Sequence, residues 1–493
     1  MQGALPPGPR RSDSVTPDPA ISFPDMPSMD LLITNAAVVT CDDERRVLGR
    51  HAILVRGNRI EGLGPSVELE AAHPGVPRFD AHGLAVLPGL INAHTHTVLT
   101  ALRGSVEDWE GDMIYGYMSP ISYTMTDEER AVMAMLGCVE AIRSGSTTLV
   151  DPFRHVLSYG RAMASTGLRL WLSESCADID TRRIRHGDYR EDPAFGAQFL
   201  DRAEAMIEGL HGSHGDRVRC QVAAHAPDNC SPAMLRKLLD LAARHSLTRT
   251  VHLSQSPGEE KAVRAARGTT SAGYLDREGF LGPDLTAAHW TFCNREDIEI
   301  LAARGVTMAH TPASISRRRG MHRALLGPIR DAGVRVAFGT DNMTEDMFQA
   351  MTIGSILHRT GRGREEEGGV LPGPDAILDA VTRDAAASVG AGHEIGRVAP
   401  GWKADLTFLD LNTPALRPVI RLVSNIVHYG HPGAVHSVMV DGAFILRDRR
   451  VLTVDEPALL READAVTRRV WARMIEQNPD LARPASELPW LEL

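Results

Sequence analysis

The chain has 493 residues, of which 43% are hydrophobic and 24% are charged, and its net charge at pH 7 is −10. This length allows one large domain with a smaller one beside it, and the negative charge without a basic block argues against a nucleic-acid partner. There is no apolar run of the roughly 18 residues that a membrane span needs, no secretory signal and no CxxC pair, so we expect a cytoplasmic protein with reduced thiols and no membrane contact.

The composition of the N-terminal part of the chain changes at Asp30. Residues 1–28 are rich in Pro, Ser, Asp and Gly, and we expect them to form a disordered tail. From residue 29 to 83, short β-type runs alternate with turn residues, which is typical of a small all-β unit.

From Leu84, short apolar runs alternate with longer amphipathic stretches. Helix signals lie between the runs: Thr126 and Glu129 form a capping box, Ser231 precedes a proline, and Asn294 precedes a helix that ends at Gly305. Eight strands alternating with helices predict a (β/α)8 TIM barrel over residues 84–394. The eight predicted strands are 84–94, 147–151, 168–174, 218–226, 249–254, 285–290, 306–311 and 334–341.

The C-terminal part returns to β texture after two helices expected near 345–361 and 375–389. The simplest arrangement is a β-sandwich domain built from both chain flanks, residues 29–83 and 395–452, beside the barrel. Residues 453–493 then form a helical tail, with a helix at 455–476.

Histidines and one carboxylate stand where the predicted strands end. Active sites of this barrel lie at the C-terminal ends of its strands, so these side chains should meet. His94 and His96 alone are a weak signal, although residues i and i+2 of a strand share a face and can bind one ion together. A single buried histidine is usually ordinary packing, but the whole set predicts a metal site. The other strand ends carry His225, His252, His289, His310 and Asp341.

The chain resembles the amidohydrolase superfamily, and within it the chlorohydrolase/deaminase branch of S-adenosylhomocysteine deaminases, guanine deaminases and triazine hydrolases. The resemblance covers residues 30–450. It is carried by Pro88-Gly-Leu-Ile-Asn-Ala-His-Thr-His96, Leu102-Arg-Gly104, His225-Ala-Pro, Cys230-Ser-Pro, His252-Leu, His289, His310-Thr-Pro-Ala-Ser, Gly339-Thr-Asp341 and Gly396–Leu406.

The resemblance implies a role for each matching residue. His94, His96, His252 and Asp341 would bind a divalent metal ion, zinc before iron, cobalt or manganese. Binuclear members carry a carboxylated lysine on strand four; strands three and four here have no lysine, so we expect one ion per subunit. His289 and Asp341 would be catalytic. His225, Arg103, Trp109 and His310 would contact the substrate, and the protein would form a homodimer or larger assembly.

Gln255 departs from the family pattern at a catalytic position. Deaminases of this branch have a glutamate three residues after the strand-five histidine, where it passes a proton to the leaving nitrogen, and an amide cannot relay a proton at neutral pH. Glu259 or Glu260 could reach into the site, but acidic residues here are more typical of the first turn of the next helix. Two smaller departures are Ile315, in place of an asparagine, and the arginine run 317–319, which is either a solvated loop or a site for an acidic group.

The function that we expect is metal-dependent hydrolysis of a non-peptide carbon–nitrogen bond. Metal-activated hydroxide would release ammonia or an amine from the amidine-type carbon of a small heterocycle. Two alternatives stay open. The substrate could be an activated amide, urea, carbamate or aryl halide that needs no glutamate, or the chain could be a non-catalytic family member.

Overall fold

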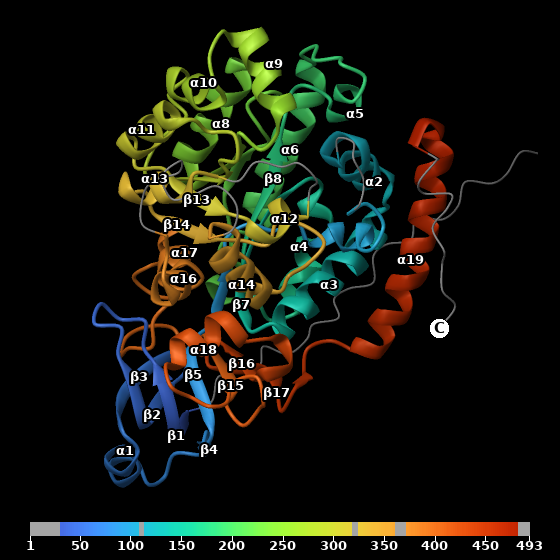
Figure 1. Cartoon of the computed structure of the whole chain (residues 1–493). Coiled ribbons are helices and arrows are strands. Elements are labelled where there is room, and N and C mark those ends of the chain that lie inside the picture. The colour runs from blue at the N-terminus through green and yellow to red at the C-terminus, as the bar shows by residue number, and fades with distance from the viewer. Residues whose placement is uncertain (1–29, 108–112, 318–323, 360–370, 482–493) are drawn as a thin grey trace, which may run out of the picture.

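The computed structural model describes residues 30–107, 113–317, 324–359 and 371–481. The tail expected to be disordered lies outside these ranges. A barrel of parallel strands surrounded by helices lies beside a second, mostly antiparallel sheet (Figure 1). The predicted fold class is confirmed.

The barrel has eight strand positions, one of them shared by β9 and β10, and the strands pair in parallel with their neighbours. Hydrogen bonds from Ala93 N to Phe338 O and from Asp341 N to His94 O, both 3.0 Å, close the barrel between its first and last strands. The strands are buried on both faces, which explains their continuous apolar runs. They are β6 (Leu90–Asn92), β7 (Ser146–Phe153), β8 (Arg169–Cys176), β9 (Val218–Cys220) with β10 (Val222–Ala224), β11 (Arg249–Leu253), β12 (Leu285–His289), β13 (Thr307–His310) and β14 (Val336–Phe338).

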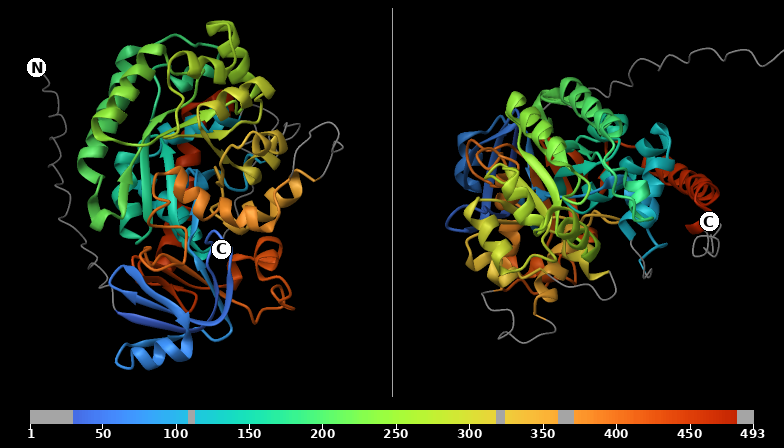
Figure 2. Two further views of the ribbon diagram at one scale, coloured as in Figure 1. Left: turned by 90° about the vertical axis from the view of Figure 1, so that its left-hand side faces the viewer. Right: turned by 90° about the horizontal axis from the view of Figure 1, so that it is seen from above.

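Helices cover the outside of the barrel (Figures 1 and 2). The predicted caps at Thr126, Ser231 and Asn294 are confirmed. The helix predicted at 375–389 is divided by the non-helical backbone of Thr382. The helices are η1 (Thr97–Leu102), η2 (Ile114–Met118), α2 (Ser119–Thr124), α3 (Asp127–Arg143), α4 (Val156–Ser165), α5 (Thr181–Ile184), α6 (Pro193–Leu210), α7 (Ser213–Asp216), α8 (Pro232–His245), α9 (Pro257–Arg267), α10 (Ser271–Arg277), α11 (Arg295–Ala303), α12 (Pro312–Ser316), α13 (Leu326–Asp331), α14 (Met347–Leu357), α16 (Pro374–Ala380) and α17 (Arg383–Ser388).

The second sheet takes strands from both flanks of the chain, as predicted. Its N-terminal and C-terminal halves meet where β5 pairs antiparallel with β15, and the two halves share one apolar core. The strands are β1 (Leu31–Val39), β2 (Val47–Arg56), β3 (Arg59–Pro65), β4 (Arg78–Asp80), β5 (Leu84–Pro88), β15 (Leu406–Asp410), β16 (Val435–Val440), β17 (Ala443–Arg447) and β18 (Arg450–Val451), accompanied by α1 (Ser66–Ala72), α18 (Leu422–Tyr429) and η3 (Pro432–Ala434).

The single first strand predicted at 84–94 is wrong. Its first half, β5, belongs to the second sheet, and only β6 belongs to the barrel. The chain passes from one sheet to the other at Gly89, where a Cβ atom would lie 2.0 Å from Thr147 Oγ1. The apolar sequence continues through this point because both halves are buried, so composition could not reveal the change. We propose that the barrel domain begins at Leu90.

The predicted terminal helix is α19 (Glu456–Gln477), followed by η4 (Pro479–Leu481). It lies along α3, where Arg143 pairs with Glu456 (2.5 and 2.6 Å). The indole of Trp471 donates to Ala101 O (2.8 Å), so this helix also braces the segment that follows His96. No helix in the described ranges is both long and apolar enough to cross a membrane.

Candidate functional site

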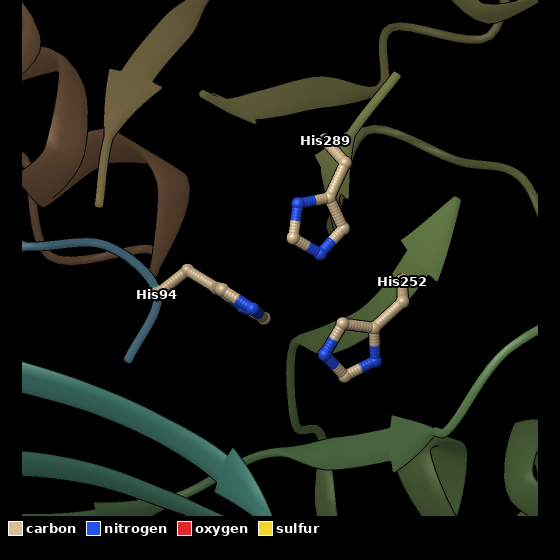
Figure 3. Close-up of side chains that lie close together, drawn as sticks. All are labelled: His94, His252 and His289. Atoms are coloured by element: carbon tan, nitrogen blue, oxygen red, sulfur yellow. The ribbon is translucent and has the colours of Figure 1, made fainter. Parts of the chain in front are cut away.

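Five buried side chains meet at the C-terminal mouth of the barrel. His94 and His96 follow β6, His252 lies in β11, His289 ends β12, and Asp341 follows β14. The rings of His94, His252 and His289 point toward one another (Figure 3), with ring centroids 4.9 to 5.5 Å apart. Asp341 Oδ1 lies 3.7 Å from His94 Nε2 and 3.4 Å from His96 Nε2. The structure therefore brings together every residue predicted to bind metal, and His289 with them.

The donor atoms of this cluster fit a divalent metal ion. His252 Nδ1 donates to the carbonyl of His225 (2.7 Å), so its Nε2 carries a lone pair and faces His96 Nε2 at 3.1 Å. Neither ring nitrogen of His94 has a hydrogen-bond partner among the described residues. Burial lowers the pKa of His252 to about 3 and that of His96 well below its usual value, which keeps both rings neutral. Three imidazoles and a carboxylate form a typical zinc ligand set.

Asp341 is held in place from its other side. Ser314 Oγ (2.5 Å) and Asn342 Nδ2 (2.8 Å) donate to Oδ2, which leaves Oδ1 toward the histidines. Its backbone is left-handed, with φ 71°, as is that of His289, with φ 82°. Such conformations cost energy in residues other than glycine and gather at functional sites.

Behind the cluster, a buried carboxyl group ties the first strand to the last. Glu345 accepts hydrogen bonds from Thr95 Oγ1 (2.7 Å) and Asn92 Nδ2 (2.9 Å), and Asn92 Nδ2 also donates to Thr340 Oγ1 (2.8 Å). Burial raises the pKa of Glu345 well above its usual value. Sequence reasoning missed this residue, because nothing in the loop after Asp341 distinguishes a buried glutamate from an exposed one.

Gly339 allows β14 to approach β6 at the metal ligands. A Cβ atom there would lie 2.5 Å from His94 O and 2.8 Å from His94 N. Gly339→Ala should therefore lower the free energy of unfolding by about 1–3 kcal/mol and weaken metal binding, which urea unfolding and metal titration would measure. Gly49→Ala is the control, because nothing lies within 4 Å of a Cβ atom at that position. Equal effects of the two substitutions would show that the close approach of β14 to β6 at Gly339 is not the cause.

His225 lies between His252 and a guanidinium group. Its Nε2 is 2.8 Å from Arg154 Nη2, and its Nδ1 is 2.6 Å from Asn229 Nδ2. Burial, and then the charge of Arg154, lower its pKa well below the usual value. Both ring nitrogens of His225 thus face protein groups. Its backbone carbonyl positions His252 by accepting the hydrogen bond from Nδ1. The contact of His225 with a substrate stays a prediction.

Gln255 is buried at the end of β11, and the two nearby glutamates are engaged elsewhere. Glu259 accepts hydrogen bonds from the backbone N–H groups of Ser254 (2.8 Å) and Gln255 (2.9 Å), and Ser254 Oγ donates to Glu260 (2.7 Å). Both glutamates lie in the first turn of α9, as expected. They hold the loop that carries Gln255.

The structure does not bring the other predicted substrate residues into the cluster. Arg103 donates to Met343 O (2.8 Å) and pairs with Glu140. His310 lies with its Nε2 3.0 Å from His358 Nε2, because its ring turns toward the end of α14. Trp109 and the arginines at 318 and 319 lie outside the described residues. Arg317 donates to Gln349 (2.6 Å), and Ile315 is buried.

A cavity of about 580 Å³ opens at the same rim of the barrel, between α9, the loop after β10 and the segment 179–191. Its size suits a small molecule. Asp228 lines it and accepts a hydrogen bond from Tyr115 (2.8 Å), whose hydroxyl in turn accepts one from Asn229 Nδ2 (3.1 Å). Because Asn229 also contacts His225, the wall of the cavity connects with the wall of the cluster.

Asp151, near the C-terminal end of β7, makes the free energy of unfolding depend on pH. Burial raises its pKa to about 7, which the hydrogen bond from Thr97 Oγ1 (2.6 Å) offsets only in part. Between about pH 4 and 7 the folded state holds a proton that the unfolded state has lost, so this contribution to stability is full below about pH 4, falls as the pH rises, and is gone above about pH 7.

Asp151→Asn should remove that pH dependence. Relative to wild type, we expect the free energy of unfolding of the variant to rise by about 2 kcal/mol between pH 5 and pH 7, measured by urea unfolding with chelator present. Asp201→Asn, an exposed position on α6, should leave the profile unchanged. A variant that keeps the wild-type slope would show that another group causes it.

Comparisons with known proteins now name the family. The model of the Amidohydrolase family matches residues 85–445. The chain belongs to the amidohydrolase family. This amidohydrolase is 30% identical to a 5-methylthioadenosine/S-adenosylhomocysteine deaminase of Syntrophobacter fumaroxidans, over 90% of this chain and 98% of the relative. It is 28% identical to a 5'-deoxyadenosine deaminase of Methanosarcina mazei, over 90% and 99%.

Solved structures share the fold of this amidohydrolase. An adenosine deaminase from Xanthomonas campestris with bound zinc superposes with a TM-score of 0.79 at 23% identity, covering 90% of this chain and 98% of that one. An atrazine chlorohydrolase from Arthrobacter aurescens, complexed with zinc, gives a TM-score of 0.78 at 20% identity, covering 89% and 100%. The protein is thus a hydrolase that acts on carbon–nitrogen bonds, with a site for a divalent metal ion.

Proposed function

We propose that this amidohydrolase releases ammonia or an amine from the amidine-type carbon of a small, nucleoside-like heterocycle. His94, His96, His252 and Asp341 would hold one zinc ion. The observation that carries the proposal is the convergence of these four ligands with His289 at the barrel mouth. Relatives that match nearly the whole chain are named as deaminases of adenine nucleosides, which are substrates of this kind.

The residues of the cluster divide the chemistry among them. A bound zinc ion would lower the pKa of a water molecule toward about 7 and so supply hydroxide. Asp341 Oδ1 faces the ligand cluster, where it can take the proton of that water. Thr311 Oγ1 lies 3.0 Å from His289 Nδ1. When this hydroxyl donates, neutral His289 carries its proton on Nε2, toward the cluster, and stabilises negative charge on the substrate.

Gln255 favours a second candidate, in which the leaving group departs without a proton from the enzyme. Gln255 cannot supply one, and Glu259 and Glu260 are occupied by the loop at the end of β11. A halide, or the leaving group of an activated amide, urea or carbamate, meets this condition. A non-catalytic role would leave the convergence of five buried ligand and acid–base groups without a cause.

The deciding experiment compares leaving groups on the zinc-loaded protein. Ammonia release would be measured from adenosine, 5'-deoxyadenosine and 5-methylthioadenosine, and then from pterins, pyrimidines and aminotriazines. Chloride release from chlorotriazines, and amine release from ureas and carbamates, would be measured in parallel. We expect ammonia release from an amino-substituted heterocycle to be the fastest reaction; turnover of only chlorinated or activated substrates would favour the second candidate.

Gln255→Glu tests the missing proton relay directly. A glutamate should protonate the leaving nitrogen, so we expect kcat for ammonia release to rise about 10- to 100-fold and to gain a dependence on pH. Gln198→Glu, at an exposed position on α6, is the matched control, since it makes the same substitution away from the cluster. A fall in ammonia release in Gln255→Glu would contradict the expectation that a carboxyl group at position 255 protonates the leaving nitrogen.

We also propose a cytoplasmic location and a homodimer or larger assembly. The support for the location is the set of six buried cysteines without a disulfide among the described residues. The assembly rests on the family resemblance. Size-exclusion chromatography with light scattering would test it.

A further inference from the structure

We propose that Arg154 binds an anionic oxygen of the substrate beside the metal cluster. The substrate would then be a heterocycle that carries a carboxylate or an ionised ring oxygen close to the carbon under attack. The inference rests on the proposed function only for the position of the substrate, because the anion site itself follows from the surroundings of Arg154.

Arg154 follows β7 directly and reaches toward the cluster. Its side chain is 2% exposed, and its Nη2 lies 2.8 Å from His225 Nε2. The His225 ring is 5.1 Å from that of the ligand His252, so only one imidazole separates the guanidinium from the metal ligands. The ring of the preceding residue, Phe153, lies 4.7 Å from His96. A substituent on the reacting ring could therefore reach Arg154.

The charge of Arg154 has no counter-ion among the described residues, where no carboxylate oxygen lies within 4 Å of its guanidinium. Every other arginine that is buried in these ranges pairs with a carboxylate: Arg130 with Asp127 (2.7 Å), Arg169 with Asp405 and Asp441 (2.7 Å each), and Arg249 with Asp284 (2.6 Å). A buried charge without a partner is costly, so the exception calls for an anion from outside this set.

The groups that do contact Arg154 leave its charge and most of its donors unused. A guanidinium offers five N–H donors, and the one hydrogen bond uses His225 as a neutral acceptor. The remaining contacts are the faces of Tyr123 (5.9 Å) and Phe153 (5.5 Å), which stabilise a cation but do not neutralise it. Guanidinium groups recognise planar oxyanions through paired hydrogen bonds. No such oxyanion contacts Arg154 among the described residues.

Arg202 provides a matched control on the same side of the barrel. Its Nη1 lies 2.7 Å from His155 Nδ1, which repeats the guanidinium–imidazole pair, but the ring of His155 packs against Tyr123 and Phe199. A general effect of positive charge in this region would affect both arginines equally. An anion site at the cluster would depend on Arg154 alone.

The test measures ligand affinity rather than turnover. Calorimetry on the zinc-loaded protein would compare nicotinate with nicotinamide for a carboxylate, and barbiturate with uracil for an ionised ring oxygen. In the wild type we expect the anion of at least one pair to bind more tightly, and Arg154→Met to reduce that preference about 10- to 100-fold. Arg154→Lys should retain part of it, and Arg202→Met should retain all of it. The pair that responds identifies the kind of oxygen.

The same anion preference in wild type and Arg154→Met, at equal zinc content, would overturn the proposal, because the anion would then bind the metal alone. If Arg154→Met does not fold, Arg154→Gln replaces it, since the amide keeps a donor and removes the charge. Arg154-dependent binding without release of ammonia or an amine from any substrate would support the anion site and contradict the proposed function. The two failures are thus distinguishable.

Discussion

Asp341→Asn should lower kcat/KM for ammonia release by about 10³- to 10⁴-fold. Asp341 is the one carboxylate in the ligand cluster, and its Oδ1 lies within 3.7 Å of both His94 Nε2 and His96 Nε2. An amide at this position neither takes a proton from water nor contributes negative charge to the metal site. We therefore expect both the metal content and the activity of the metal-saturated enzyme to fall, as measured by atomic emission and steady-state kinetics.

Asp346→Asn is the control for that substitution. Asp346 caps α14 five residues further along the chain, and asparagine caps helices about as well as aspartate. Its activity should stay near that of the wild type. Activity within about 10-fold of the wild type in Asp341→Asn would contradict the role of this carboxylate as ligand and base.

His289→Gln should lower kcat by about 10²- to 10³-fold while metal content stays near that of the wild type. His289 lies in the cluster, with ring centroids 5.4 Å from His94 and 5.5 Å from His252, but its role is to act on the substrate. We expect KM to change less than kcat, because the interaction strengthens as negative charge develops.

Two comparisons isolate this effect from a general loss of a buried histidine. His358→Gln changes a buried histidine outside the cluster and should leave kcat within a few-fold of the wild type. If His289→Gln loses metal to the same extent as Asp341→Asn, His289 is a ligand rather than a catalytic group.

The sequence predicts the metal cluster because the barrel imposes a simple geometric rule. Parallel strands end at one rim, so side chains separated by up to 247 positions, from His94 to Asp341, must meet there. The same rule could have found Arg154, but the strand was expected to end at residue 151, and β7 continues to Phe153. An error of two residues in a strand boundary thus concealed the residue on which the further inference depends.

Other features depend on packing that no local pattern records. The passage between the two sheets at Gly89 lies inside a continuous apolar run. His310 follows the same rule as His289, yet its ring turns toward His358. Glu345 lies in a polar loop after β14, and its burial accompanies hydrogen bonds from Asn92 and Thr95, at the end of the neighbouring strand β6. These outcomes depend on packing against residues that are distant in the sequence.

The most direct test of the metal-dependent mechanism is the metal content of the purified protein, measured together with its ammonia release. We expect about one divalent ion per chain, loss of activity on chelation, and recovery when zinc is restored. Simultaneous substitution of His94 and His96 should abolish both the bound ion and the recovery. Less than about 0.2 ions per chain, with no activity after reconstitution with zinc, iron or cobalt, would contradict it.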